Sequence, residues 1–302
     1  MKQFITFLFL LCCPVLFGQI SGRATKAPVD RDTLNKLALI VKNNPANADS
    51  HKKFINYLGI DSEELVKQYE AWSKEFPKCA MVPFALGEAY QSVESPKAKP
   101  WLLKAVAIDP KMAKAYYYLW IDGERWGDFN ASREYLRMAM EADPASPDYA
   151  FYYRSGFKND DPERYKAGMY EMPKLFPGHE RGAQSLYWLG LFLKDTKERL
   201  SVYQYLKENF PPAKSNWSSS GMYDYFYLLL ETDLQKAEQL ASELEVSSSR
   251  EGDKKSWNSR VKLAQDLIKV NALISENKFT EAMDVSFAIT LDRRSGANEM
   301  MY

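Results

Sequence analysis

Apolar residues along this 302-residue chain recur at helical spacing in segments divided by short polar turns. Leu34, Leu37 and Val41 fall on one face of a helix, and the same spacing returns in later segments. Asn44-Pro45 ends the first of them, since a residue before Pro is pushed out of the α region. The pattern predicts an all-α protein.

Prolines end these segments at a regular interval. Six of them recur at nearly equal spacing along the chain: Pro45, Pro77, Pro110, Pro144, Pro177 and Pro211. Such a period, of about 33 residues, is typical of a stacked helical repeat. In such an array no helix pair buries its apolar stripe alone, and neighbouring pairs cover one another. We therefore expect an α-solenoid of about six to seven helix–turn–helix units.

Two consecutive units carry a more specific pattern. The first has Leu86-Gly87 and Tyr90, and the second has Leu119 and Trp120. Their second helices share the same offsets, with Ala98, Leu102, Ala105 and Pro110 in one and Ser132, Leu136, Ala139 and Pro144 in the other. This pattern resembles the tetratricopeptide repeat, in which small residues let helix B approach helix A. The resemblance implies a right-handed superhelical solenoid, and Trp120, where Gly is usual, implies different packing in its unit.

The repeat pattern divides the chain into unequal parts. We expect the solenoid to span residues 30–302. Its best-formed repeats cover 80–144, degenerate repeats cover 145–211, a loop covers 211–221, further repeats cover 222–295, and an incomplete helix begins at 296–302. A solenoid end normally needs a polar cap. We therefore expect either a truncated product or an apolar end that pairs with another surface.

The first residues have the composition of a targeting segment. Lys2 precedes an apolar stretch that ends near Gly18, as in a secretory signal peptide. We expect residues 1–18 to be a signal peptide and 19–29 a linker, with no transmembrane segment after cleavage, because a membrane span needs about 20 apolar residues. Lipid attachment at Cys12 or Cys13 is the alternative. The expected location is the periplasm or cell envelope of a Gram-negative-type bacterium.

The sequence is poor in residues that could perform catalysis. Its 40 basic and 40 acidic residues cancel, so nothing indicates a nucleic-acid partner. Cys79 is the single thiol left after signal cleavage, and only two histidines, His51 and His179, occur. The sequence contains no Cys-x-x-Cys and no Gly-rich phosphate loop. We expect no metal, no cofactor and no enzymatic activity.

Aromatic residues make up 14% of the chain and suggest a binding surface. In tetratricopeptide arrays helix A lines the concave wall. The resemblance therefore implies that six side chains face inward: Tyr117, Glu124, Arg125, Arg154, Lys158 and Trp188. Arg, Tyr and Trp are enriched at binding hot spots. The leading interpretation is an exported, non-catalytic scaffold for protein or peptide partners. The competing interpretation is that the aromatics only fill gaps between helix pairs.

Two further functions stay open. Exported arrays of this kind can precede a thioredoxin-like redox domain, so the chain is a candidate for the helical N-terminal portion of such a protein. The aromatic content also allows a glycan-binding envelope protein.

Overall fold

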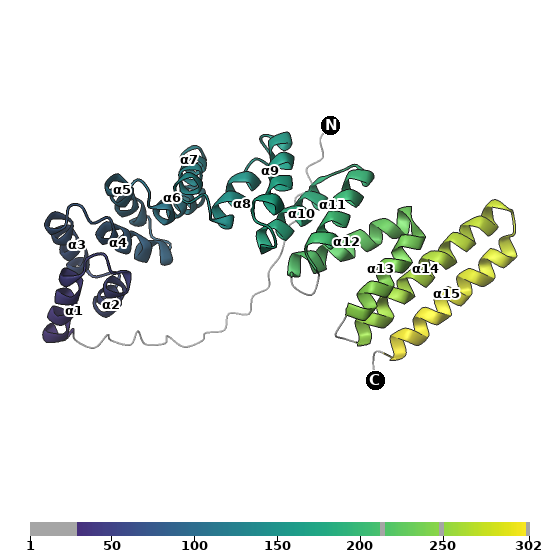
Figure 1. The fold of residues 1–302 in the computed structure, drawn as a ribbon. Coiled ribbons are helices and arrows are strands. Elements are labelled where there is room, and N and C mark those ends of the chain that lie inside the picture. Colours follow the sequence, from purple (N-terminus) through teal and green to yellow (C-terminus); the bar gives the residue numbers. More distant parts are fainter. Residues whose placement is uncertain (1–28, 212–214, 248–250, 300–302) are drawn as a thin grey trace, which may run out of the picture.

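The computed structural model describes residues 29–211, 215–247 and 251–299. These residues form fifteen helices and no strand, in an array that runs from α1 and α2 at one end to α14 and α15 at the other (Figure 1). The helices are α1 (Arg31–Asn43), α2 (Ala48–Leu58), α3 (Glu63–Glu75), α4 (Met81–Ser92), α5 (Ala98–Ile108), α6 (Ala113–Trp126), α7 (Phe129–Ala142), α8 (Pro147–Ser155), α9 (Pro162–Leu175), α10 (Glu180–Phe192), α11 (Thr196–Asn209), α12 (Asn216–Thr232), α13 (Leu234–Ser247), α14 (Glu251–Ser275) and α15 (Phe279–Glu299).

Each helix packs against the next one, and even-numbered helices also meet each other. Contacts join α2 to α4, α4 to α6, α8 to α10 and α10 to α12. The even-numbered helices are therefore the A helices and the odd-numbered ones from α3 onward are the B helices. After α1, the described helices form seven A–B pairs. The all-α fold and the number of units agree with the sequence-based prediction, whereas the hand of the superhelix stays a prediction.

Close approach within a pair depends on small residues. A Cβ atom built on Gly87 of α4 would lie 2.9 Å from the Leu102 side chain of α5. In the next pair Trp120 occupies the usual Gly position, and the close approach is made one turn later. There a Cβ on Gly123 would lie 2.6 Å from the Ser132 Cβ. The packing of this unit differs as expected, because the contact point has moved along α6.

The buried side chains form two clusters. One extends from Leu34 to Ala139 and the other from Ala150 to Val261. The degenerate repeats belong to the second cluster, where Tyr165 and Met169 are fully buried in α9. Large side chains thus replace the small ones of the repeat, and the two cores adjoin where α8 follows α7.

The predicted loop at 211–221 is too long. Helix α12 already begins at Asn216, because the Ser215 side chain accepts a hydrogen bond from the Ser218 backbone N at 3.1 Å. This is an N-cap, which satisfies an amide that the first helical turn would otherwise leave unpaired. Ser218 is itself fully buried and donates its hydroxyl to the Phe210 carbonyl oxygen.

The predicted break near the end of the chain is wrong as well. We expected the repeats to end at residue 295 and another helix to begin at 296, but α15 continues from Phe279 to Glu299. Asp109 and Asp143 are each followed by Pro, whereas Asp292 is followed by Arg293, so nothing removes the next backbone hydrogen bond. Residues 300–302 lie outside the described residues.

The predictions for the N-terminal segment also fall largely outside the described residues. The signal peptide at 1–18 and all but the last residue of the linker at 19–29 are not among the described residues. Within the described residues, no helix combines the length and apolar character needed to cross a membrane.

Candidate binding surface

Aromatic side chains follow one another across four successive A helices. We call them the aromatic ladder: Tyr117, Trp120, Tyr149, Tyr152, Tyr187, Trp188 and Trp217. They come from α6, α8, α10 and α12, and all seven are partly exposed. The ladder is therefore neither buried in the core nor fully exposed to solvent.

Ring contacts join α6 to α8 across the boundary of the two cores. The ring centroids of Tyr117 and Tyr149 lie 5.2 Å apart, and those of Trp120 and Tyr152 lie 5.1 Å apart. Both separations fall within the range that aromatic pairs prefer. The spacing along each helix explains the arrangement, because residues three apart share one face.

The ladder continues from α8 to α12. The buried Phe151 ring lies 5.1 Å from Trp188, and Trp188 lies 6.3 Å from Trp217 in an edge-to-face arrangement. Tyr187 lies 5.8 Å from the same Trp217 ring. Each A helix thus touches the next through aromatic side chains.

Arg181 connects α10 to α8 at the centre of the ladder. Its Nε donates to Asp148 at 2.6 Å, its Nη1 to Gln184 at 2.5 Å and its Nη2 to the Tyr152 hydroxyl at 2.9 Å. The guanidinium also lies 4.8 Å from the Tyr152 ring centroid and 5.0 Å from that of Phe151. Arg is suited to this position because its planar fork can donate several bonds while stacking on an aromatic face.

The phenols of Tyr117 and Tyr149 remain protonated at neutral pH. Burial, followed by the influence of Tyr152 and Asp148, raises the pKa of Tyr117 to about 12. Burial and then Asp143 raise the pKa of Tyr149 as well. These hydroxyls can therefore donate hydrogen bonds to a partner.

Two of the predicted site residues belong to the ladder. Tyr117 and Trp188 both lie there, although they are connected only through the rings of α8. Glu124 is exposed near the end of α6 and accepts a hydrogen bond from the Ser132 hydroxyl at 2.5 Å. Arg125 points toward the preceding pair, where its Nη2 lies 3.4 Å from Glu94. Neither contacts a ladder ring.

The predicted inward orientation of Arg154 is wrong. Arg154 follows the buried Ala150 by four residues and so shares its face. Its guanidinium donates to the Met140 sulfur of α7 and lies 3.3 Å from Glu171 of α9. A Cβ on Gly168 of α9 would lie 3.0 Å from the Arg154 Cβ. Arg154 therefore packs among B helices.

The predicted position of Lys158 on a helix A face is also wrong. Helix α8 ends at Ser155, so Lys158 lies exposed in the turn before α9. The prediction assumed a helix A of full length, but this one has 9 residues. Its start is set by Ser146, which caps it, and by Pro147 at its first position.

Five ladder residues were not predicted from the sequence: Trp120, Tyr149, Tyr152, Tyr187 and Trp217. A local signal existed for two pairs, since Trp120 follows Tyr117 by three residues and Tyr152 follows Tyr149 by three. No such signal marks Trp217, because it falls within the segment that was expected to be a loop.

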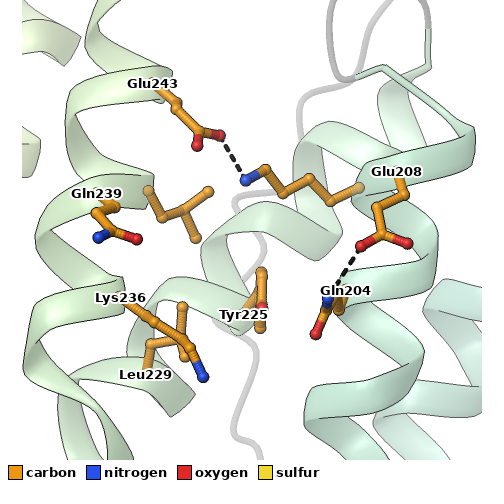
Figure 2. Close-up of a pocket in the computed structure, with 9 residues that line it drawn as sticks. Gln204, Glu208, Tyr225, Leu229, Lys236, Gln239 and Glu243 are labelled. Carbon is orange, nitrogen blue, oxygen red and sulfur yellow. Dashed lines mark hydrogen bonds and ion pairs between the residues drawn. The ribbon is translucent and has the colours of Figure 1, made fainter.

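One hollow lies away from the ladder. It has a volume of about 180 Å³ and lies between B helices α11 and α13, with Tyr225 and Leu229 of α12 at its floor (Figure 2). Charged side chains at its rim pair with each other, as in the 2.5 Å contact between Lys207 and Glu243. Pockets that hold small molecules are usually larger than this, and Gln204 also donates to Glu208 at 2.9 Å within it.

Catalytic groups do not converge on the ladder. His51 is buried beside Tyr69, and His179 caps α10 by accepting from the Arg181 backbone N at 3.1 Å. Among the residues that the structure describes, no group of three His, Cys, Asp or Glu side chains could hold a metal ion.

Comparison with known proteins gives structural overlaps only. No protein-family model matches the chain, and no curated protein matches it. PilF from Pseudomonas aeruginosa is 15% identical with a TM-score of 0.41, over 76% of this chain and 97% of its own. YrrB, described as a TPR protein with an unusual peptide-binding site, is 16% identical with a TM-score of 0.40, over 65% and 93%. The Naa15/Naa10 complex bound to HypK-THB gives 17% and 0.48, over 86% and 36%.

These overlaps are too loose to assign a function, and the fold assignment rests on the chain's own helices. Seven A–B pairs follow one another, and the prolines between them recur at nearly equal intervals. By this order and spacing, the chain has the fold of a tetratricopeptide-type array of stacked helical pairs.

Proposed function

We propose that this chain is an exported, non-catalytic scaffold that binds protein or peptide partners through the aromatic ladder. The observation that carries the proposal is the run of seven partly exposed Tyr and Trp side chains on four A helices, joined between α8 and α10 by the buried Phe151 ring. Tyr and Trp offer large, rigid contact areas at low cost in conformational entropy. Aromatics that only filled gaps between helices would be covered, whereas these keep exposed surface.

A peptide selection tests the binding role. A displayed library of random peptides is selected on immobilised wild-type protein and on the Trp120→Ala/Trp188→Ala variant. Trp126→Ala is the matched control, because Trp126 is 54% exposed but lies at the end of α6 and outside the ladder. We expect the wild type and the control to enrich the same peptides and the ladder variant to lose them. Enrichment that is equal on all three proteins would contradict the role of the ladder.

Two other outcomes bear on the alternatives. A glycan array on the same proteins should show no ladder-dependent binding, and binding lost in Trp120→Ala/Trp188→Ala would favour the glycan function instead. Export is supported by the composition of residues 1–18. Mass spectrometry of the chain expressed in a Gram-negative host should find a mature protein that begins at Gln19. A lipid-modified Cys12 or Cys13 would replace that proposal with an anchored form.

A further inference from the structure

We propose that the partner places a positively charged side chain, lysine or arginine, beside Asp224 at the α12 end of the aromatic ladder. This inference rests on the proposed function and adds the charge of the bound segment. Three observations support it. Asp224 shares a helix face with a ladder residue, its carboxylate has no partner in the described part of the chain, and charges at the centre of the ladder are already paired.

Asp224 lies on the same face of α12 as Trp217. The two residues are seven positions apart, which is two turns of the helix. Gly221 lies between them, and a Cβ atom built there would be 3.6 Å from Cδ2 of Tyr187 on α10. The Tyr187 ring centroid is also 5.8 Å from that of Trp217. Burial and then Asp224 raise the pKa of Tyr187, so the carboxylate is within electrostatic reach of this ladder ring.

The Asp224 carboxylate is half-buried and has no hydrogen bond or ion pair to any residue that the structure describes. Arg199 of α11 acts on it from a distance, since its Nε donates to the Gly190 carbonyl oxygen at 3.2 Å. Burial raises the pKa of Asp224, and Arg199 offsets this only in part. Removing a carboxylate from water without a partner is unfavourable, so a cationic ligand group would stabilise it.

Charged groups at the centre of the ladder are already paired. Arg181 donates to Asp148 at 2.6 Å, and Lys114 of α6 lies 2.7 Å from Glu88 of α4. A charged ligand group at these positions would have to break a pair and leave one charge uncompensated. Asp224 can accept a cation without this loss.

The rings beside Asp224 favour the same ligand group. Cations are attracted to the faces of Tyr and Trp rings, and Tyr187 and Trp217 supply one ring of each kind. Lysine and arginine combine an apolar stem, which packs on rings, with a charged end that can reach a carboxylate. An acidic segment would instead be repelled by Asp224.

The random-peptide selection, extended to three variants, tests the charge of the partner. They are Asp224→Asn, Asp224→Lys and Asp49→Asn, the last a control that removes one exposed negative charge on α2, outside the ladder. We expect wild type and Asp49→Asn to enrich peptides with Lys or Arg, and Asp224→Asn to lose this preference. Asp224→Lys should prefer Asp or Glu, a reversal that a structural role of Asp224 would not produce.

Calorimetric titration with the most enriched wild-type peptide measures the contribution of the pair. Replacing its Lys or Arg by Gln should weaken binding to the wild type about threefold to fivefold, as expected for a partly exposed ion pair. The same replacement should leave binding to Asp224→Asn unchanged. The difference should shrink as the salt concentration rises, because salt screens exposed charges.

Two outcomes would overturn the inference and leave the scaffold function intact. One is ladder-dependent selection of peptides without enrichment of Lys or Arg. The other is an equal loss of affinity in wild type and Asp224→Asn when the peptide charge is removed. A selection without any ladder-dependent peptide would remove the scaffold function and this inference with it.

Discussion

His51 shows how a single polar side chain is held in the core of the first A–B pair. It is fully buried, with Nε2 2.9 Å from the Pro45 carbonyl oxygen and Nδ1 2.8 Å from the Tyr69 hydroxyl. A carbonyl oxygen can only accept, so Nε2 carries the proton of the neutral ring and Tyr69 donates to Nδ1. Burial lowers the pKa of His51, and the bond to Pro45 opposes this only in part.

The burial of His51 predicts that the stability of the folded protein depends on pH. In the unfolded chain a His has a pKa near 6.5, and in the folded chain that of His51 is lower. Below about pH 6.5 the unfolded state therefore binds more protons. The stability that the neutral ring contributes is complete above this pH and is lost as the pH falls toward the folded value. The Tm of the wild type should be lower at pH 5.5 than at pH 7.5.

Two variants isolate the contribution of His51. In His51→Gln the difference in Tm between pH 7.5 and pH 5.5 should shrink, because no ring titrates at this position. In His179→Gln, which changes an exposed side chain at a helix end, the difference should persist. A decrease that is equally large in His51→Gln would assign the pH dependence to other groups.

At the scale of the helix pair, close packing depends on glycines whose positions the repeat pattern locates in part. Leu86-Gly87 stands in the expected place on α4, Leu189-Gly190 repeats the pair on α10, and both glycines meet the paired B helix closely. In α6 the corresponding residue is Trp120, and the contact passes to Gly123. The repeat pattern thus predicts that a small residue is needed, while the structure shows which turn of the helix supplies it.

Gly190 provides a test of this packing. A Cβ there would lie 2.5 Å from Cζ of Tyr203, whose side chain is fully buried in α11. Overpacking of this kind costs about 1 to 3 kcal/mol, so Gly190→Ala should lower the free energy of unfolding by that amount in urea titrations. Gly156→Ala is the control, since its Cβ would meet backbone oxygen atoms only at 3.5 and 3.6 Å. Similar losses in both variants would contradict the packing argument.

At the scale of the whole molecule, the last described pair leaves apolar side chains uncovered. On α15 Met283 is 71% exposed and Phe287 is 66% exposed, and they follow Phe279 at four-residue spacing on one face. In earlier pairs such a face of helix B is covered by the next A helix. Large exposed apolar patches promote association.

This surface predicts self-association that substitution can relieve. Met283→Gln/Phe287→Gln should raise the concentration at which the 19–302 chain remains monomeric in sedimentation experiments. Leu175→Gln on α9 is the control, because Leu175 is 50% exposed but lies away from α14 and α15, and should change little. A wild-type chain that stays monomeric at every concentration, with no difference among variants, would show that the exposed face has no such effect.

The sequence by itself determined the all-α class, the pairing of the helices and the number of units. Those features depend on neighbouring residues: apolar spacing selects a helix, and a proline after Asp109 or Asp143 ends it. The resemblance to the tetratricopeptide repeat also assigned Tyr117 and Trp188 to helix A faces. Only the tertiary structure decided which side chains on those faces come together. Arg154 and Lys158 do not belong to the ladder, because Arg154 shares the buried face of α8 and the helix ends before Lys158. Tyr117, Tyr149 and Trp217 share one ladder because packing brings together residues that are far apart in the chain.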